Sequence, residues 1–132
     1  MSAVDQGSFP ADLRYHPEHA WVRIEGDTAT VGISWFAQDT LKEVVFFDPP
    51  RVGDAVTKDQ PYATIESVKA VSDVYAPMSG EIVEVNTALT GGVRAVNDDP
   101  YGGGWMVRAR LSDPGEAGAL LSAEEYETSV RA

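Results

Sequence analysis

The sequence predicts a mainly β protein that ends in a short helical segment. Between Ala20 and Leu111, short runs of alternating apolar and polar residues follow one another at near-regular spacing, with turn residues between them. Such spacing is typical of an all-β sandwich or barrel. Beyond Leu111 the pattern changes to signals for helix N-termini. A chain of 132 residues is long enough for one domain and too short for two ordinary ones.

A hairpin and a capped helix are predicted in the first part of the domain. The runs Trp21–Glu25 and Thr28–Ile33 are separated by Gly26-Asp27, a turn pair that joins antiparallel strands. Ser34 then provides an N-cap for a short helix over Trp35–Leu41.

A second hairpin is predicted in the middle of the chain. The strand Val44–Phe47 ends at Asp48-Pro49-Pro50, because proline has no donor for the strand ladder. The runs Tyr62–Glu66 and Val71–Tyr75 are then separated only by residues 67–70, so residues 62–75 are interpreted as one tight hairpin. Two further strands are expected, at Glu81–Asn86 and Trp105–Leu111.

Two short helices are predicted over about residues 114–131. Asp113 precedes Pro114 and Glu116, a pattern typical of a helix N-terminus, and Ser122 with Glu125 forms a capping box for the second helix. The residues expected to face the β core are Leu120, Leu121, Tyr126 and Val130. At the other end, residues 1–12 are interpreted as a tail and residues 13–132 as a single domain.

Composition excludes several classes of function. The formal charge is 10 − 21 = −11 and the pI is near 4.4, which argues against binding to nucleic acid or to anionic membranes. No apolar run is long enough for a membrane span. Without cysteine there is no disulfide, iron–sulfur cluster or thiol nucleophile, so sulfur redox chemistry would need an attached group. The N-terminus lacks secretory or transit features, and we expect a cytoplasmic protein, although a processed organellar chain would look the same.

Lys69 stands apart from the other two lysines, Lys42 and Lys58, because it lies in the tight connection between two predicted strands. A solvated charge that keeps the hairpin soluble is the simplest interpretation. A Schiff-base lysine needs burial or a cationic neighbour, whereas Glu66 and Asp73 are negative and favour the ammonium form. A third interpretation is an anchor for a covalently attached group, because a hairpin tip exposes the amine to a modifying enzyme.

Other residues whose side chains could bind a metal or take part in catalysis are interpreted as structural. His16 and His19 lie close together without a third ligand at convincing spacing, so no metal site is expected. Neighbouring carboxylates are typical of solvated turns and helix faces. No Ser/His/Asp arrangement suggests a hydrolase, and we expect no independent enzyme activity.

The segment Glu66–Asn86, ESVKAVSDVYAPMSGEIVEVN, closely resembles the lipoyl-attachment region of the glycine cleavage system H proteins. Other segments resemble the same family in the same order: Tyr15–Trp21, Val31–Asp39, Glu43–Phe46, Asn97–Trp105 and Leu120–Tyr126. The resemblance extends over about residues 13–130. It implies the family's fold, a lipoyl/biotinyl-type barrel-sandwich hybrid (hammerhead) with short helices at the ends.

The resemblance also implies a carrier rather than an enzyme, with lipoic acid amide-linked to Lys69. Its partners would be glycine decarboxylase (P protein), which loads an aminomethyl group; aminomethyltransferase (T protein), which removes it; dihydrolipoamide dehydrogenase (L protein), which reoxidises the arm; and lipoyl-attaching enzymes. The chain would act as a monomer. The residues assigned to the attachment site are Glu66, Ser67, Val68, Lys69, Ala70 and Asp73.

The resemblance further implies a cleft in which the loaded arm docks, with His19 and Asp73 as candidate lining residues. Two departures from the family stand out. Ala20 occupies a position where the family typically has an acidic residue, which leaves one polar contact to the bound amine unassigned. Residues 89–96 are less acidic than in the family, and we expect a changed loop there.

Three alternatives share the same attachment chemistry or a similar hairpin. Lipoyl domains of 2-oxo acid dehydrogenases are shorter and commonly have Asp-Lys-Ala at the tip. Biotin carriers usually place methionines beside the lysine, where this chain has Val68 and Ala70. A lipoyl donor or relay protein for other complexes would have the same attachment site. For each partner, the acidic surface suggests a basic rim on the other protein.

Overall fold

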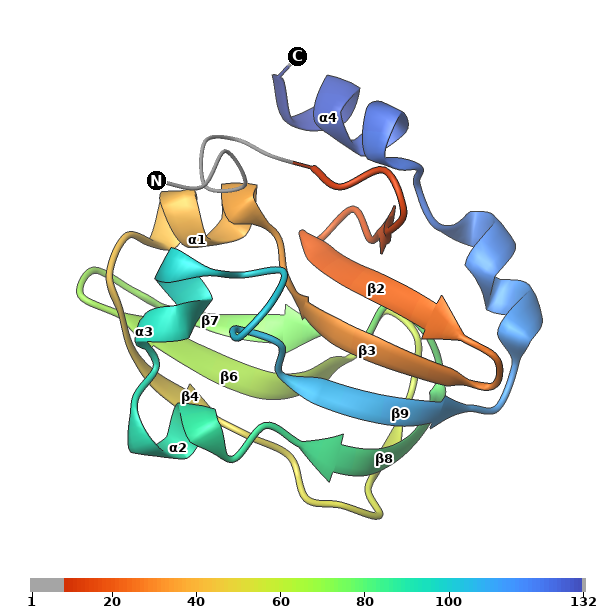
Figure 1. Ribbon diagram of the computed structural model, residues 1–132, viewed down its shortest axis with the longest axis horizontal. Helices are drawn as coiled ribbons and strands as arrows, with labels where there is room; N and C mark the ends of the chain where they lie inside the picture. The colour runs from red at the N-terminus through yellow and green to blue at the C-terminus, as the bar shows by residue number, and fades with distance from the viewer. Residues whose placement is uncertain (1–8, 132) are drawn as a thin grey trace.

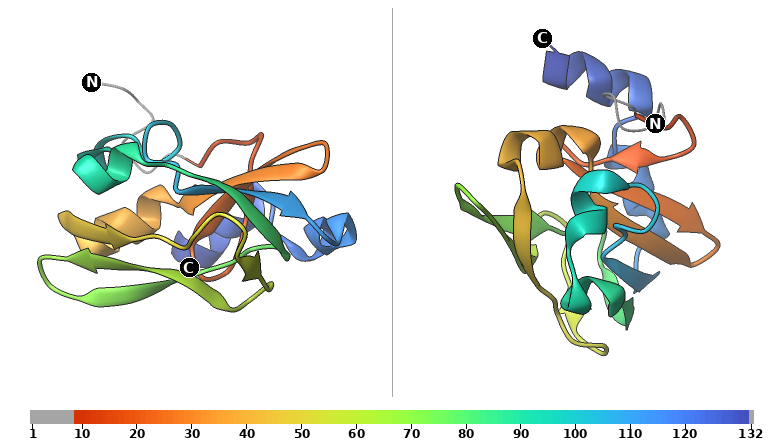
Figure 2. Two further views of the ribbon diagram at one scale, coloured as in Figure 1. Left: turned by 90° about the horizontal axis from the view of Figure 1, so that it is seen from below. Right: turned by 60° about the vertical axis from the view of Figure 1, so that its left-hand side comes forward.

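The computed structural model describes residues 9–131, and within them the chain forms two antiparallel sheets (Figure 1). The strand order is β1-β2-β3-β9-β8-β5 in the larger sheet and β4-β6-β7 in the smaller. The larger sheet consists of β1 (Arg14–Tyr15), β2 (Ala20–Glu25), β3 (Thr28–Ile33), β9 (Val107–Leu111), β8 (Gly80–Val85) and β5 (Ala55–Val56). The smaller consists of β4 (Val44–Asp48), β6 (Pro61–Ser67) and β7 (Val71–Tyr75). Figure 2 shows the sheets as two layers, with the β6–β7 hairpin reaching one end of the molecule.

Short helices flank the sheets, and two of them begin at the caps that the sequence predicts. The Ala37 N–H donates to Ser34 Oγ at 3.2 Å. In the capping box, the Glu125 N–H donates to Ser122 Oγ at 3.1 Å, and the Ser122 N–H donates to the Glu125 carboxylate at 2.9 Å. The helices are α1 (Trp35–Leu41), α2 (Ala88–Gly91), α3 (Arg94–Asp98), the 3-10 helix η2 (Pro114–Ala119) and α4 (Ala123–Arg131). None of the helices within residues 9–131 has the length and apolar character needed to cross a bilayer.

Residues 89–96, predicted to form a loop, lie in a segment that contains α2 and α3, so that prediction is wrong. Buried Leu89 and Val96 attach the two helices to the core. The Asn86 side chain supports the start of α2 by accepting a hydrogen bond from the Ala88 N–H at 3.2 Å. Helices of four and five residues are too short to produce a readable apolar period.

Two other predicted elements differ in detail. The strand expected from Trp105 begins at Val107, because the Trp105 N–H donates to the Gly102 carbonyl at 3.0 Å in the preceding turn. The helix predicted after Asp113 is a 3-10 helix, although Asp113 caps it as expected by accepting from the Gly115 N–H at 3.1 Å.

Buried apolar side chains between the two sheets form the main core, to which Leu120 belongs. A second, aromatic cluster attaches α4 to β1 and β2, where the rings of Tyr15 and Tyr126 stack 4.7 Å apart. Leu121 and Val130 pack against this cluster, so the predicted inward-facing residues do face the β structure. Of the predicted tail, residues 1–8 lie outside the described residues. Phe9 packs edge-on against Tyr126, with ring centroids 5.4 Å apart.

Gly80→Ala tests the close approach of β8 to β9. Gly80 pairs with Leu111, and a Cβ atom at residue 80 would collide with the carbonyl oxygen of Arg110. Because that backbone cannot shift without breaking ladder hydrogen bonds, we expect the free energy of unfolding to fall by about 2 kcal/mol or more, measured by urea denaturation. Gly91→Ala, where nothing lies within 4 Å of the added atom, should change it by less than about 0.5 kcal/mol. Equal stability of the two variants would contradict the close approach.

Candidate functional site

Lys69 lies in the turn that joins β6 to β7, and the buried hydroxyl of Ser67 holds this turn. Ser67 Oγ accepts hydrogen bonds from the Ala70 N–H at 3.1 Å and from the Lys69 N–H at 3.3 Å. The Ser67 N–H in turn donates to the Ala70 carbonyl at 2.8 Å. The backbone of Lys69 is therefore held at both ends of a short turn, while its side chain is exposed.

The turn is also attached to the neighbouring strand. The Val68 N–H donates to the Glu43 carbonyl at 2.9 Å, and Val44 pairs with Ser67 in the sheet. All three strands of the smaller sheet thus restrain the tip. Lys69 forms no ion pair with any side chain described among residues 9–130, and its amine lacks the burial that a Schiff-base lysine requires.

The residues that the resemblance assigns to the attachment site all lie on this hairpin. They are Glu66 and Ser67 at the end of β6, Val68, Lys69 and Ala70 in the turn, and Asp73 in β7. Val68, Ala70 and Asp73 are exposed, whereas Glu66 is half-buried.

A small cavity of about 140 Å³ lies between α1 and the hairpin. His19 and Asp73, the two candidate lining residues, both line it, so the structure brings together residues that are far apart in the sequence. Its other lining residues are Glu18, Ala20, Ile33, Phe36, Ala37, Thr40, Leu41, Ile65, Ser72 and Val74. The cavity therefore combines a mostly apolar wall with two carboxylates, those of Glu18 and Asp73.

Glu18 and the wall formed by α1 were not predicted from the sequence. Phe36, Ala37, Thr40 and Leu41 are spaced one helical turn apart in two pairs, so the face of the predicted helix could have been recognised from its period. Nothing in the sequence shows which surface that face covers. Ala20, at the position where the family typically has an acidic residue, also lines the cavity.

His19 is held in one orientation by residues from the far end of the chain. Its Nδ1 lies 2.8 Å from the Tyr126 hydroxyl, which lies 2.7 Å from Ser34 Oγ. Ser34 Oγ already accepts from the Ala37 N–H. We therefore assign the Ser34 hydroxyl as the donor to the Tyr126 oxygen, and the Tyr126 hydroxyl as the donor to His19 Nδ1. Burial lowers the pKa of His19, outweighing the opposite effect of Glu18, so the imidazole is neutral near pH 7.

His16 has a different set of partners from His19. Its Nδ1 accepts from the Glu18 N–H at 3.0 Å, and its Nε2 lies 2.6 Å from an Asp59 carboxylate oxygen. Hydrogen bonds from His16 and then from Lys58 lower the pKa of Asp59. Within residues 9–131 no three His, Asp or Glu side chains gather as metal ligands would.

Comparison with known proteins identifies the family. The family model described as "Glycine cleavage H-protein" matches residues 13–132. The chain belongs to the glycine cleavage H-protein family. The glycine cleavage system H protein of Rubrobacter xylanophilus is 56% identical over 117 residues, covering 89% of this chain and 90% of the relative. The glycine cleavage system H protein of Symbiobacterium thermophilum is 49% identical over 122 residues, covering 92% of this chain and 95% of the relative.

A solved structure is similar over the same length. The crystal structure of a glycine cleavage system H protein from Mycobacterium marinum matches with a TM-score of 0.85 and 38% identity, covering 93% of this chain and 99% of that chain. The family and the predicted fold class are therefore confirmed. H proteins are the lipoyl carriers of the glycine cleavage system, and this chain is a carrier component of that kind.

Tyr126→Phe tests the hydrogen-bonded chain at His19. The phenylalanine ring keeps the stacking on Tyr15. His19 Nδ1, however, loses the hydrogen bond from the Tyr126 hydroxyl, which it can accept only when the imidazole is neutral. We therefore expect the pKa of His19 to rise, measured by NMR titration of its ring protons. The matched control is Tyr15→Phe, because the Tyr15 hydroxyl donates to the Pro10 carbonyl instead; it should leave the pKa unchanged. An unchanged or lowered pKa of His19 in Tyr126→Phe would contradict the assignment of Tyr126 as the donor to His19 Nδ1.

Proposed function

We propose that this chain carries its lipoyl group on Nζ of Lys69 and that the arm takes an aminomethyl group from the P protein to the T protein, with reoxidation by the L protein. The observation that carries the proposal is an exposed lysine, without an ion pair to any described side chain, on a turn whose backbone is fixed by Ser67, within the segment that resembles the family's attachment region. We further propose that the protein works as a monomer in the cytoplasm, as expected from the sequence.

The residues around Lys69 suit a covalent anchor. The amine is open to a lipoyl-attaching enzyme, and the fixed turn sets the point from which the arm starts. When bound, a lipoyl group supplies a disulfide that accepts a carbon fragment and electrons. The chain has no cysteine, so its own residues cannot provide this chemistry. They can hold, position and shield the arm.

The cavity between α1 and the hairpin is suited to shielding a loaded arm. It begins close to the anchor, because β7 starts at Val71 and contributes Ser72 and Asp73 to the lining. An unpaired ammonium is costly to remove from water, and Asp73 and Glu18 supply the acceptors that it would need. A neutral His19 adds no repelling charge. Glu18 thereby supplies a carboxylate in place of the acidic residue that the family typically has at the position of Ala20.

Lys69→Arg tests the anchor, with Lys42→Arg and Lys58→Arg as matched controls. We expect intact-mass spectra of protein isolated from its own host to show one lipoyl increment in the parent and in both controls, and none in Lys69→Arg. Acylation also removes one positive charge, so the formal charge becomes −11 − 1 = −12. Persistence of the increment in Lys69→Arg would refute the assignment.

The same preparations separate a working shuttle from a lipoyl relay. A shuttle supports glycine decarboxylation when it is combined with the P protein, and this activity should be lost in Lys69→Arg. A lipoylated protein that is inactive with the P protein would support the relay function instead.

Asp73→Asn and Glu18→Gln test the cavity. Protein is loaded by the P protein, and the spontaneous loss of the amine is then followed in the absence of the T protein. We expect about fivefold faster loss or more in each variant, because a shielded ammonium loses a charged acceptor. Glu25→Gln, at the exposed end of β2 and outside the cavity, is the control. Retention of the amine for as long as in the parent protein would show that the loaded arm rests elsewhere.

A further inference from the structure

The turn that connects β1 to β2 carries two residues that line the cavity between α1 and the hairpin, Glu18 and His19. His19 has a φ of 76°, in the left-handed region that residues other than glycine seldom adopt. The His19 N–H donates to the His16 carbonyl at 2.8 Å, and the His16 N–H donates to the Ala20 carbonyl at 2.9 Å. These bonds are internal to the segment, so the orientation of Glu18 depends on what holds the segment from outside.

The buried side chain of His16 connects this turn to the turn between β5 and β6. His16 is 5% exposed. Its Nδ1 accepts a hydrogen bond from the Glu18 N–H at 3.0 Å and therefore carries no hydrogen of its own. We assign the imidazole hydrogen to Nε2, which donates to an Asp59 carboxylate oxygen at 2.6 Å. One side chain thus holds the backbone of Glu18 and is itself held by Asp59.

Asp59 is fixed to the body of the protein. Its N–H donates to the Ala76 carbonyl, just after β7, at 2.9 Å. Its second carboxylate oxygen accepts from Lys58 Nζ at 3.0 Å, and the Lys58 N–H donates to Ser79 Oγ at 2.9 Å. The hydrogen bonds from His16 and then from Lys58 lower the pKa of Asp59, so the carboxylate stays ionised and remains an acceptor. The turn between β5 and β6 is therefore a firm support for His16.

A hollow of about 470 Å³ adjoins the cavity. Glu18 lines both spaces, and β7 contributes Asp73 to the cavity and Tyr75 to the hollow. Lys58 and Asp59 line the hollow and not the cavity. The ammonium group of Lys58 gives the Glu18 carboxylate a second direction in which to turn, because opposite charges attract. The position of the Glu18 backbone decides between the two directions.

This restraint matters because Glu18 lies in a turn. The family typically has an acidic residue at the position of Ala20, which begins β2 and pairs with Ile33, so the sheet ladder fixes that position. Glu18 lies between β1 and β2 and outside the ladder. A carboxylate on a turn needs another support to keep one orientation, and the hydrogen bond to His16 supplies it.

We propose that His16 and Asp59 are positioning residues, which together hold the turn so that Glu18 faces the cargo in the cavity rather than Lys58 in the hollow. The inference rests on the proposed function, because the cargo is the ammonium group of an arm anchored at Lys69. Neither His16 nor Asp59 lines the cavity. Both act on the cargo through the backbone of Glu18.

The first test follows the spontaneous loss of the amine from protein loaded by the P protein, in the absence of the T protein. Asp59→Gly removes the partner of His16, and glycine tolerates the φ of 71° that Asp59 adopts. We expect about threefold faster loss in this variant. In the Glu18→Gln background the same substitution should change the rate by less than about 1.5-fold, because the acceptor through which it acts is already neutral. A full additional effect in that background would overturn the proposal.

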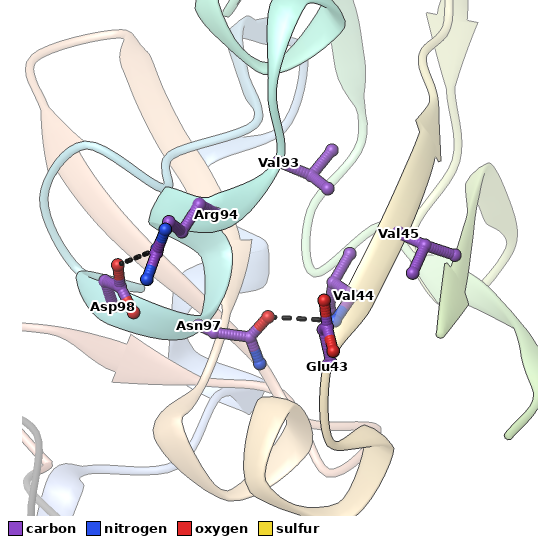
Figure 3. A pocket seen from close by; sticks show the side chains of 7 residues that line it. All are labelled: Glu43, Val44, Val45, Val93, Arg94, Asn97 and Asp98. Carbon is purple, nitrogen blue, oxygen red and sulfur yellow. Dashed lines mark hydrogen bonds and ion pairs between the residues drawn. The ribbon is translucent and has the colours of Figure 1, made fainter. Parts of the chain in front are cut away.

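Asp98→Ala is the matched control, because it removes an ion-paired carboxylate from another hollow. Asp98 accepts from Arg94 Nε at 3.2 Å, within α3. Figure 3 shows this pair beside the hollow between α3 and β4, with Asn97 directed toward Val44. Alanine suits a helix as glycine suits a positive φ. Asp98→Ala should leave the rate of amine loss unchanged, and an acceleration equal to that in Asp59→Gly would overturn the proposal.

Hydrogen exchange of the Glu18 amide tests the contact itself, on protein without the lipoyl group. His16→Gln keeps a donor near the position of Nε2 but loses the acceptor at Nδ1, whereas His16→Asn keeps that acceptor and loses the bond to Asp59. We expect exchange, followed by NMR, to be about tenfold faster in His16→Gln and about threefold faster in His16→Asn.

Asp59→Gly provides the same measurement without a change in the buried core, and should also give about threefold faster exchange of the Glu18 amide. Asp98→Ala should leave this exchange unchanged. Parental exchange rates in His16→Gln and in Asp59→Gly would overturn the positioning role.

The outcomes separate this inference from the proposed function. Parental rates of amine loss in Asp59→Gly, together with faster loss in Glu18→Gln, would overturn the positioning role alone. A lipoyl increment that persists in Lys69→Arg would overturn the proposed function. The exchange of the Glu18 amide does not depend on the arm, so it decides in either case whether His16 and Asp59 hold the turn.

Discussion

The hydrogen bonds of the Ser67 hydroxyl to the hairpin backbone are the constraint on which the candidate site depends. They hold the turn around Lys69 from inside, while the bond from Val68 to the Glu43 carbonyl holds it from the neighbouring strand. The backbone of Lys69 is thereby fixed and its amine stays free. A carrier needs both properties, because its arm must start from a defined place and still reach several enzymes.

The rest of the fold arranges two different surfaces on either side of this turn. Inside, β7 and α1 enclose a cavity whose carboxylates suit a cationic cargo. Tyr126 of α4 is bonded to His19 in that cavity, which gives the C-terminal helix a part in the site's electrostatics. Outside, a bulge in β4 leaves Phe46 about half exposed. Lys69 lies where these two surfaces meet.

Much of the local structure could be predicted from the sequence because it depends on neighbours along the chain. The alternation of apolar and polar residues predicted most of the strands, and the capping box of Ser122 and Glu125 predicted the start of α4. Prediction was wrong where short-range patterns are weak, as in the two short helices near Leu89 and Val96. It also gave no sign that Phe46 is exposed, because a bulge depends on the pairing partner of a strand.

The sequence by itself determined the family, the position of the single lysine between two strands and the absence of cysteine from the chain. These follow from residue order and composition, which need no folded structure. Only the tertiary structure decided that Glu18 joins His19 and Asp73 around one cavity, and that Tyr126 orients His19. Such contacts join segments distant in sequence, and side-chain packing between α1, α4 and the two sheets selects them.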